Sequence, residues 1–180
     1  MASHILRHYL LGAMLLVSFS AFSEDKLEIP KLGEGEGYLL LGLYVHDIIP
    51  SKIMLKGDGF LSTESMTDLI PGDQYDLIAV KAGEYTFDRV YNNALLNDKI
   101  YWDLEAIDFT VKVEPGTISY GGHLISEVQA SRQAIFRLRN RGSQALEYLE
   151  YCCSSLLENY KLKYTGKVTD PYLTKLQEKK

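Results

Sequence analysis

The chain of 180 residues carries 19 lysine or arginine and 24 aspartate or glutamate residues, which gives a formal net charge of −5. Nucleic-acid binding needs a cationic surface that neutralises phosphates, and the densest basic segment, residues 132–141, is too short to reverse the sign of the chain. We therefore expect no nucleic-acid partner. A chain of this length buries a large core as one domain without covalent staples.

Residues 1–23 have the pattern of a signal peptide. Arg7 precedes an apolar run over residues 9–19, and small residues then stand at the −3 and −1 positions before a cleavage site between Ser23 and Glu24. The run is shorter than the roughly 20 residues of a membrane-spanning helix, and no cysteine begins the mature chain, which excludes a lipid anchor. We expect a protein exported to the periplasm, with no transmembrane segment in the mature chain. Further secretion stays open.

Residues 24–37 are polar, contain Pro30 and end in the sequence GEGEG, which predicts a flexible leader. The glycine spacing is not a dinucleotide fingerprint, because no strand precedes it and no helix follows it. We expect no cofactor.

Seven strand-like segments follow, separated by glycine, proline and asparagine: residues 38–47, 51–56, 76–81, 84–91, 108–114, 116–124 and 132–139. In the fifth segment Phe109, Val111 and Val113 alternate with polar residues, which is typical of a half-solvated antiparallel strand. Many short strands without helical periods between them predict a mainly β fold. We expect an antiparallel β-sandwich of about seven strands over residues 38–141.

Two turns share one pattern, in the sequences LIAVKAGEYTF (residues 77–87) and FTVKVEPGTISY (residues 109–120). Each has a strand ending in Val-Lys, a short turn with a glycine and a second strand. Gly83 and Gly116 suit a positive φ, and Pro115 presets the torsion before Gly116. We predict that each unit is a β-hairpin.

Residues 142–180 are predicted to form a C-terminal helix and tail of the same domain. Ser143 is a suitable N-cap, and apolar residues recur at helical spacing, at Ala145, Tyr148 or Leu149, Cys152, Leu156 and Tyr160. We expect the helix to pack on one sheet and an edge strand to follow at residues 161–166. Adjacent residues rarely reach disulfide geometry, so we interpret Cys152 and Cys153 as small hydrophobic side chains.

The order of these elements resembles exported bacterial proteins of a domain-of-unknown-function family. The similarity rests on the signal peptide, the apolar first strand, the AGEYTF and PGTISYGG turns and the final ALEYL, LLENYKLKYTG and DPY segments. It covers residues 37–172 and implies a small β-sandwich of the carboxypeptidase-regulatory or transthyretin-like kind. It brings no catalytic residues.

Catalytic and metal-binding motifs are weak in this chain. His46, Asp47 and His123 are candidate metal ligands, but structural zinc uses four ligands and catalytic zinc three, and no local histidine pair is present, so no metal site is expected. No G-x-S-x-G segment marks a serine nucleophile. We predict no catalytic residue.

Binding residues are more plausible candidates. Tyr101 and Trp102 lie in a polar segment, where aromatic residues with a polar atom suit recognition, although Trp102 packed on the core is an equal alternative. His46 and His123 are weaker binding candidates, and the glycine pair before His123 predicts a bulge at a strand end.

These observations favour a non-enzymatic periplasmic binding or interaction module. We expect it to contact an envelope protein or glycan through loop aromatic residues or a sheet edge. The alternative is a small cell-envelope hydrolase acting on glycan or peptide. The oligomeric state stays open.

Overall fold

The computed structural model describes residues 29–59, 62–92, 100–104, 107–129 and 133–170. The predicted signal peptide with its cleavage site at Ser23 and Glu24 lies outside these residues, as do parts of the leader, of the segment before Tyr101 and of the C-terminal tail. The elements in chain order are β1 (Glu36–Asp47), β2 (Lys52–Gly57), β3 (Thr63–Met66), β4 (Gly72–Lys81), β5 (Gly83–Tyr91), β6 (Tyr101–Asp103), β7 (Thr110–Val113), β8 (Thr117–Val128), β9 (Ala134–Arg139), α1 (Gly142–Asn159) and β10 (Lys161–Tyr164).

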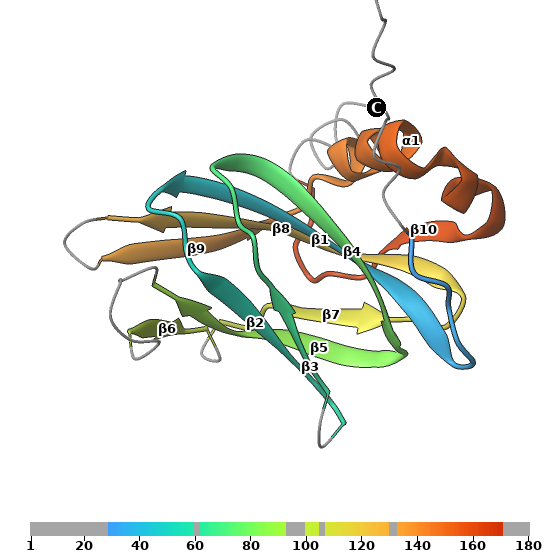
Figure 1. The fold of residues 1–180 in the computed structure, drawn as a ribbon, viewed down its shortest axis with the longest axis horizontal. Coiled ribbons are helices and arrows are strands. Elements are labelled where there is room, and N and C mark those ends of the chain that lie inside the picture. Colours follow the sequence, from blue (N-terminus) through green and yellow to red (C-terminus); the bar gives the residue numbers. More distant parts are fainter. Residues whose placement is uncertain (1–28, 60–61, 93–99, 105–106, 130–132, 171–180) are drawn as a thin grey trace, which may run out of the picture.

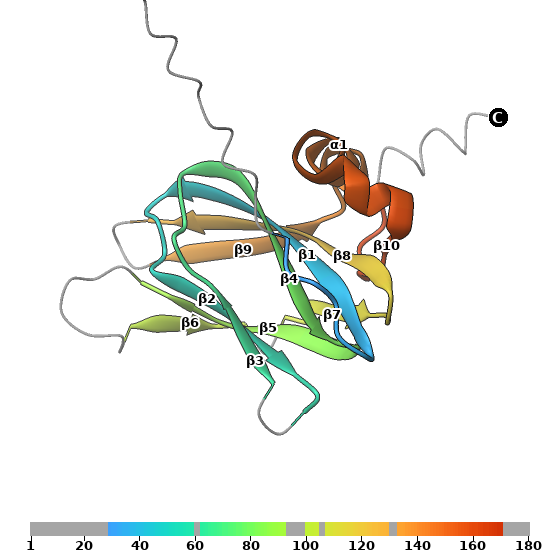
Figure 2. The ribbon, with the colours of Figure 1, turned by 45° about the vertical axis from the view of Figure 1, so that its right-hand side comes forward.

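The strands form two sheets that face each other, and α1 lies on the outer face of one of them (Figures 1 and 2). Sheet A has the order β10-β8-β1-β4, with β9 also paired to β8; sheet B has the order β3-β2-β5-β6, with β7 also paired to β5. The mainly β fold with a C-terminal helix is therefore confirmed. The described part has more strands than the predicted seven, because β3 and β6 are too short to show a period. The pairing is also not antiparallel throughout, since β8 runs parallel to β1 and to β10.

Strand β1 is buried on both faces. Leu39, Leu41 and Leu43 point into the core between the sheets, whereas Tyr38 and Leu40 point towards α1. We call the first the sandwich core and the second the helix-side core. Burial on both faces explains why β1 reads as a nearly continuous apolar run rather than an alternating one.

Both predicted hairpins are wrong in their pairing. The turn at Gly83 joins β4 of sheet A to β5 of sheet B, and the turn at Gly116 joins β7 of sheet B to β8 of sheet A. Gly116 has the expected positive φ of 65°, but Gly83 does not have one. Turn residues predict where a chain reverses, but they do not determine whether the two strands pair with each other or with strands of different sheets.

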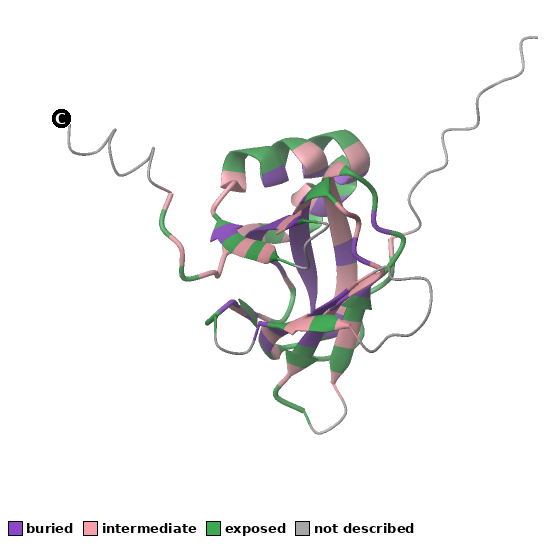
Figure 3. Ribbon diagram, turned by 90° about the vertical axis from the view of Figure 1, so that its left-hand side faces the viewer, coloured by how far each residue is buried: buried purple, intermediate pink, exposed green. Residues whose placement is uncertain are grey.

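The N-cap of α1 lies two residues earlier than predicted, so Ser143 is not its cap. Arg141 holds the N-cap position, and the Asn140 side chain accepts a hydrogen bond of 3.0 Å from the Gly142 N–H. The buried residues of α1 are Ala145, Leu149, Cys153 and Leu156, which pack with residues of sheet A. The buried parts of the helix ribbon lie on its side next to the sheet (Figure 3). Among the described residues, no helix is long and apolar enough to cross a membrane.

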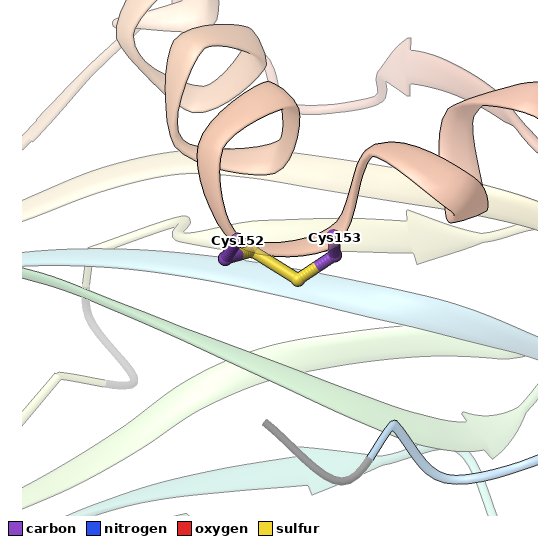
Figure 4. Close-up of a disulfide and its surroundings, with 2 residues drawn as sticks. All are labelled: Cys152 and Cys153. Atoms are coloured by element: carbon purple, nitrogen blue, oxygen red, sulfur yellow. A yellow bond between two sulfur atoms is a disulfide. The ribbon is translucent and has the colours of Figure 1, made fainter. Parts of the chain in front are cut away.

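The interpretation of the cysteines as unbonded side chains is wrong. Cys152 and Cys153 form a disulfide with each other (Figure 4). The backbone of Cys153 leaves the helical region, with φ −150° and ψ 40°, and divides α1 at this point. This departure from helical geometry brings two adjacent side chains together.

Candidate functional site

A bulge in β8 sets the position of His123. Tyr120 lies opposite Leu40 of β1 and His123 lies opposite Gly42, so the two glycines between them face a single residue of the partner strand. Gly122 has a φ of 119°, which favours glycine. The predicted bulge is therefore present, but it lies within β8 and not at its end, because β8 continues to Val128. The bulge also separates two pairings on one edge of β8, which pairs with β10 before the glycines and with β9 after them.

His123 is fully buried on the helix side of sheet A. Its ring occupies the space above Gly42, where an added Cβ would lie 2.3 Å from Nδ1. On the opposite side of Gly42, Tyr75 of β4 contacts the His123 ring edge to face, with centroids 5.3 Å apart. Because Gly42 has no side chain, the His123 ring of β8 and the Tyr75 ring of β4 can meet above it.

Asp73, near the start of β4, lies between two basic side chains. Its Oδ1 is 2.9 Å from Nε2 of His123 and accepts a hydrogen bond of 2.6 Å from Nη1 of Arg141. The His123 contact is not aligned as a hydrogen bond. Burial and then Arg141 lower the pKa of His123 to about 4, and Asp73 opposes them only in part. His123 is therefore neutral at pH 7, and the ion pair is formed by Asp73 and Arg141.

A depression with aromatic and carboxylate walls opens to solvent above this ion pair. The Tyr75 and Tyr148 rings are stacked with centroids 4.6 Å apart, and Tyr151 is 94% exposed. Burial, then Asp73, raises the pKa of Tyr75 to about 12, so its hydroxyl stays protonated and can donate a hydrogen bond. We call this site the tyrosine depression; its volume is about 430 Å³, and it is lined by Asp73, Tyr75, Gln144, Glu147, Tyr148 and Tyr151.

The residues predicted for binding lie in three separate places. His46 is exposed near the end of β1, where Nδ1 is 2.9 Å from Oδ2 of Asp47. Tyr101 is 45% exposed on strand β6 of sheet B. Trp102, the next residue, packs against the sandwich core and lies 6.0 Å from Phe136. β6 belongs to sheet B, whereas His123 contacts Tyr75 on the helix side of sheet A, which is turned away from sheet B.

Sequence reasoning missed most of the tyrosine depression. The signal was present in α1, where Gln144, Glu147, Tyr148 and Tyr151 have the spacing of one helix face. The contribution of Asp73 was not predictable, because it depends on how β4 pairs with β1. No group of metal-ligating side chains is found within the described ranges.

Comparison with known proteins found no matching family model, no similar curated protein and no similar solved structure. The resemblance of the sequence to an exported family with a small β-sandwich therefore stays a prediction.

Proposed function

We propose that the protein is an exported, non-enzymatic binding module of the bacterial cell envelope that recognises a glycan through the tyrosine depression. One observation supports this most strongly. Tyr151 is 94% exposed beside the stacked Tyr75 and Tyr148 rings. A tyrosine this exposed contributes little burial to the core, and aromatic residues with a polar atom are favoured where a protein meets a ligand.

The chemistry of the depression suits a sugar. Flat aromatic faces pack against the C–H faces of a pyranose ring, and the hydroxyl groups of the sugar need convergent polar partners. Asp73, Gln144 and Glu147 line the same depression and supply carboxylate and amide oxygens. The volume of about 430 Å³ falls within the range of small-ligand sites.

The location of the protein is part of the same proposal. The signal-peptide pattern of residues 1–23 supports transport to the periplasm. A glycan ligand is available there in the cell envelope. The sequence resemblance to exported β-sandwich proteins supports the same location, and it implies no catalytic residue.

A small envelope hydrolase is the second candidate. It is favoured by two carboxylates, Asp73 and Glu147, in one depression, with His123 directly behind Asp73. Paired carboxylates can serve as acid and base in glycoside hydrolysis. Binding without turnover is preferred, because His123 is fully buried and has no surface with which to reach a substrate.

Binding to cell-envelope polysaccharides, peptidoglycan among them, tests the proposal. We expect the purified protein to bind at least one of them and Tyr151→Ala to weaken binding about tenfold or more, as for an aromatic hot spot. Tyr101→Ala on sheet B is the matched control, with another exposed tyrosine removed. Retained binding by Tyr151→Ala together with loss in Tyr101→Ala would move the site to β6. Release of reducing sugar ends during incubation would favour the hydrolase.

A further inference from the structure

The buried face of α1 has the pattern of one unbroken helix. Ala145, Leu149, Cys153 and Leu156 are spaced by four, four and three residues, which is the repeat of a continuous apolar stripe. The backbone does not follow this pattern. At Cys153 the φ of −150° and ψ of 40° are far from the values near −63° and −42° of an α-helix.

The disulfide accounts for this break. Consecutive side chains on an α-helix point about 100° apart around the axis, so two adjacent cysteines cannot bond while both keep helical geometry. The chain passes from one coil to the next at the bonded pair (Figure 4). The sequence thus encodes a straight helix, and the bond between Cys152 and Cys153 holds it divided.

We infer that the Cys152–Cys153 disulfide is a redox-reactive site, that its substrate is a dithiol reductant of the cell envelope, and that reduction joins the two segments of α1. Cys153 is only 3% exposed and packs in the helix-side core, whereas Cys152 is partly exposed. Attack by a reductant is therefore directed at Sγ of Cys152, with Cys153 as the leaving group.

The exchange takes two steps. A thiolate of the reductant attacks Sγ of Cys152, the protein S–S bond breaks, and Cys153 leaves as a thiolate. The second thiol of the reductant then attacks the mixed disulfide, and Cys152 leaves in turn. The dithiol is oxidised to a disulfide and loses two electrons and two protons, and the protein gains them as two thiols.

Reduction changes the tyrosine depression, and this part of the inference rests on the proposed function. The second segment of α1 is anchored to the sheet by Leu156, which is buried in the helix-side core, and by the ring of Tyr160, whose centroid lies 5.1 Å from that of Tyr38. A return of Cys153 to helical geometry alters its φ by about 90°. The two segments must then turn relative to each other, which shifts Tyr148 and Tyr151 of the first segment, so the depression has one form when oxidised and another when reduced.

Thiol alkylation and amide hydrogen exchange test the inference on the full chain, with dithiothreitol as the reductant. We expect two alkylatable thiols per chain only after reduction, and exchange of the amides next to Cys153 slowed about tenfold as helical hydrogen bonds form. Cys152→Ser is the matched control, because it lacks the bond. It should show the slow exchange with and without reductant.

Two results would overturn the inference. One is a pair of free thiols that persists under oxidised glutathione, and the other is exchange around Cys153 that is the same before and after reduction. If thiols and exchange respond as expected but no polysaccharide binds in either redox state, the redox site stands and the proposed glycan binding fails. If binding occurs and differs at least about tenfold between the two states, both are supported.

Discussion

Acid should destabilise this protein through His123. The pKa of this buried side chain is lowered from 6.5 to about 4 in the folded protein, first by burial and second by Arg141. Above pH 6.5 the imidazole is neutral in both states, and its contribution to stability is complete. As the pH falls from 6.5 to 4, the unfolded chain binds a proton that the folded chain does not, so the free energy of unfolding decreases. At about 1.4 kcal/mol per pKa unit, the total loss is about 3 kcal/mol.

Urea unfolding of the oxidised protein between pH 7.5 and 4 measures this loss. Carboxylates titrate in the same range, so the free energy of unfolding of His123→Gln is subtracted at each pH, which removes their shared contribution. We expect the difference between wild type and His123→Gln to shrink by about 3 kcal/mol as the pH falls. In an Arg141→Gln background the loss should be smaller, because one cause of the lowered pKa is gone. A difference that is constant, or that grows towards acid, would refute the assignment of a neutral His123.

Two further substitutions test the packing around the site and the edge of sheet A. Gly42→Ala should lower the free energy of unfolding by about 3 kcal/mol, because the new Cβ would lie 2.3 Å from Nδ1 of His123. Gly83→Ala is the control, because its Cβ would lie 3.7 Å from its nearest neighbour, and it should change the stability measured by thermal unfolding by less than about 1 kcal/mol. Equal losses in both variants would contradict the packing of His123 over Gly42. Asp76→Val should increase the rate of aggregation measured by light scattering. Asp76 lies on edge strand β4 opposite Leu41 of β1, which faces the sandwich core, and an inward-facing charge on an edge strand resists the addition of another strand. An unchanged rate would show that this edge is protected in another way.

Strand positions were largely predictable, but strand partners were not. The strand-like segments at residues 84–91 and 38–47 predicted β5 and β1 to within two residues at each end. Local periodicity reports only which side chains share a face. The parallel pairing of β1 with β8 joins segments far apart in the chain. For this reason the two similar turns were expected to be hairpins, although both connect the sheets.

The surroundings of His123 were hidden for a related reason. Before the bulge, Ile118 and Tyr120 face the helix-side core; after it, Leu124 faces the sandwich core. The two glycines shift the alternation by one residue, and glycine itself carries no side chain from which the shift can be read. A simple period-two extrapolation from Tyr120 therefore places His123 in the wrong layer. Only the register against β1 shows that it lies over Gly42.

The tyrosine depression and the bonded cysteines meet at one short segment of α1. Tyr151 lies on the exposed side of the first helical segment, immediately before the residues whose bond divides the helix. Its ring makes little contact with the core, so its position is set mainly by the backbone of the helical segment that carries it. On our proposal, a change in the dihedral angles of Cys153 moves this segment and with it Tyr151. The two proposals together predict that glycan affinity and the redox state of Cys152 and Cys153 are coupled reciprocally, so both should be measured on the same preparation.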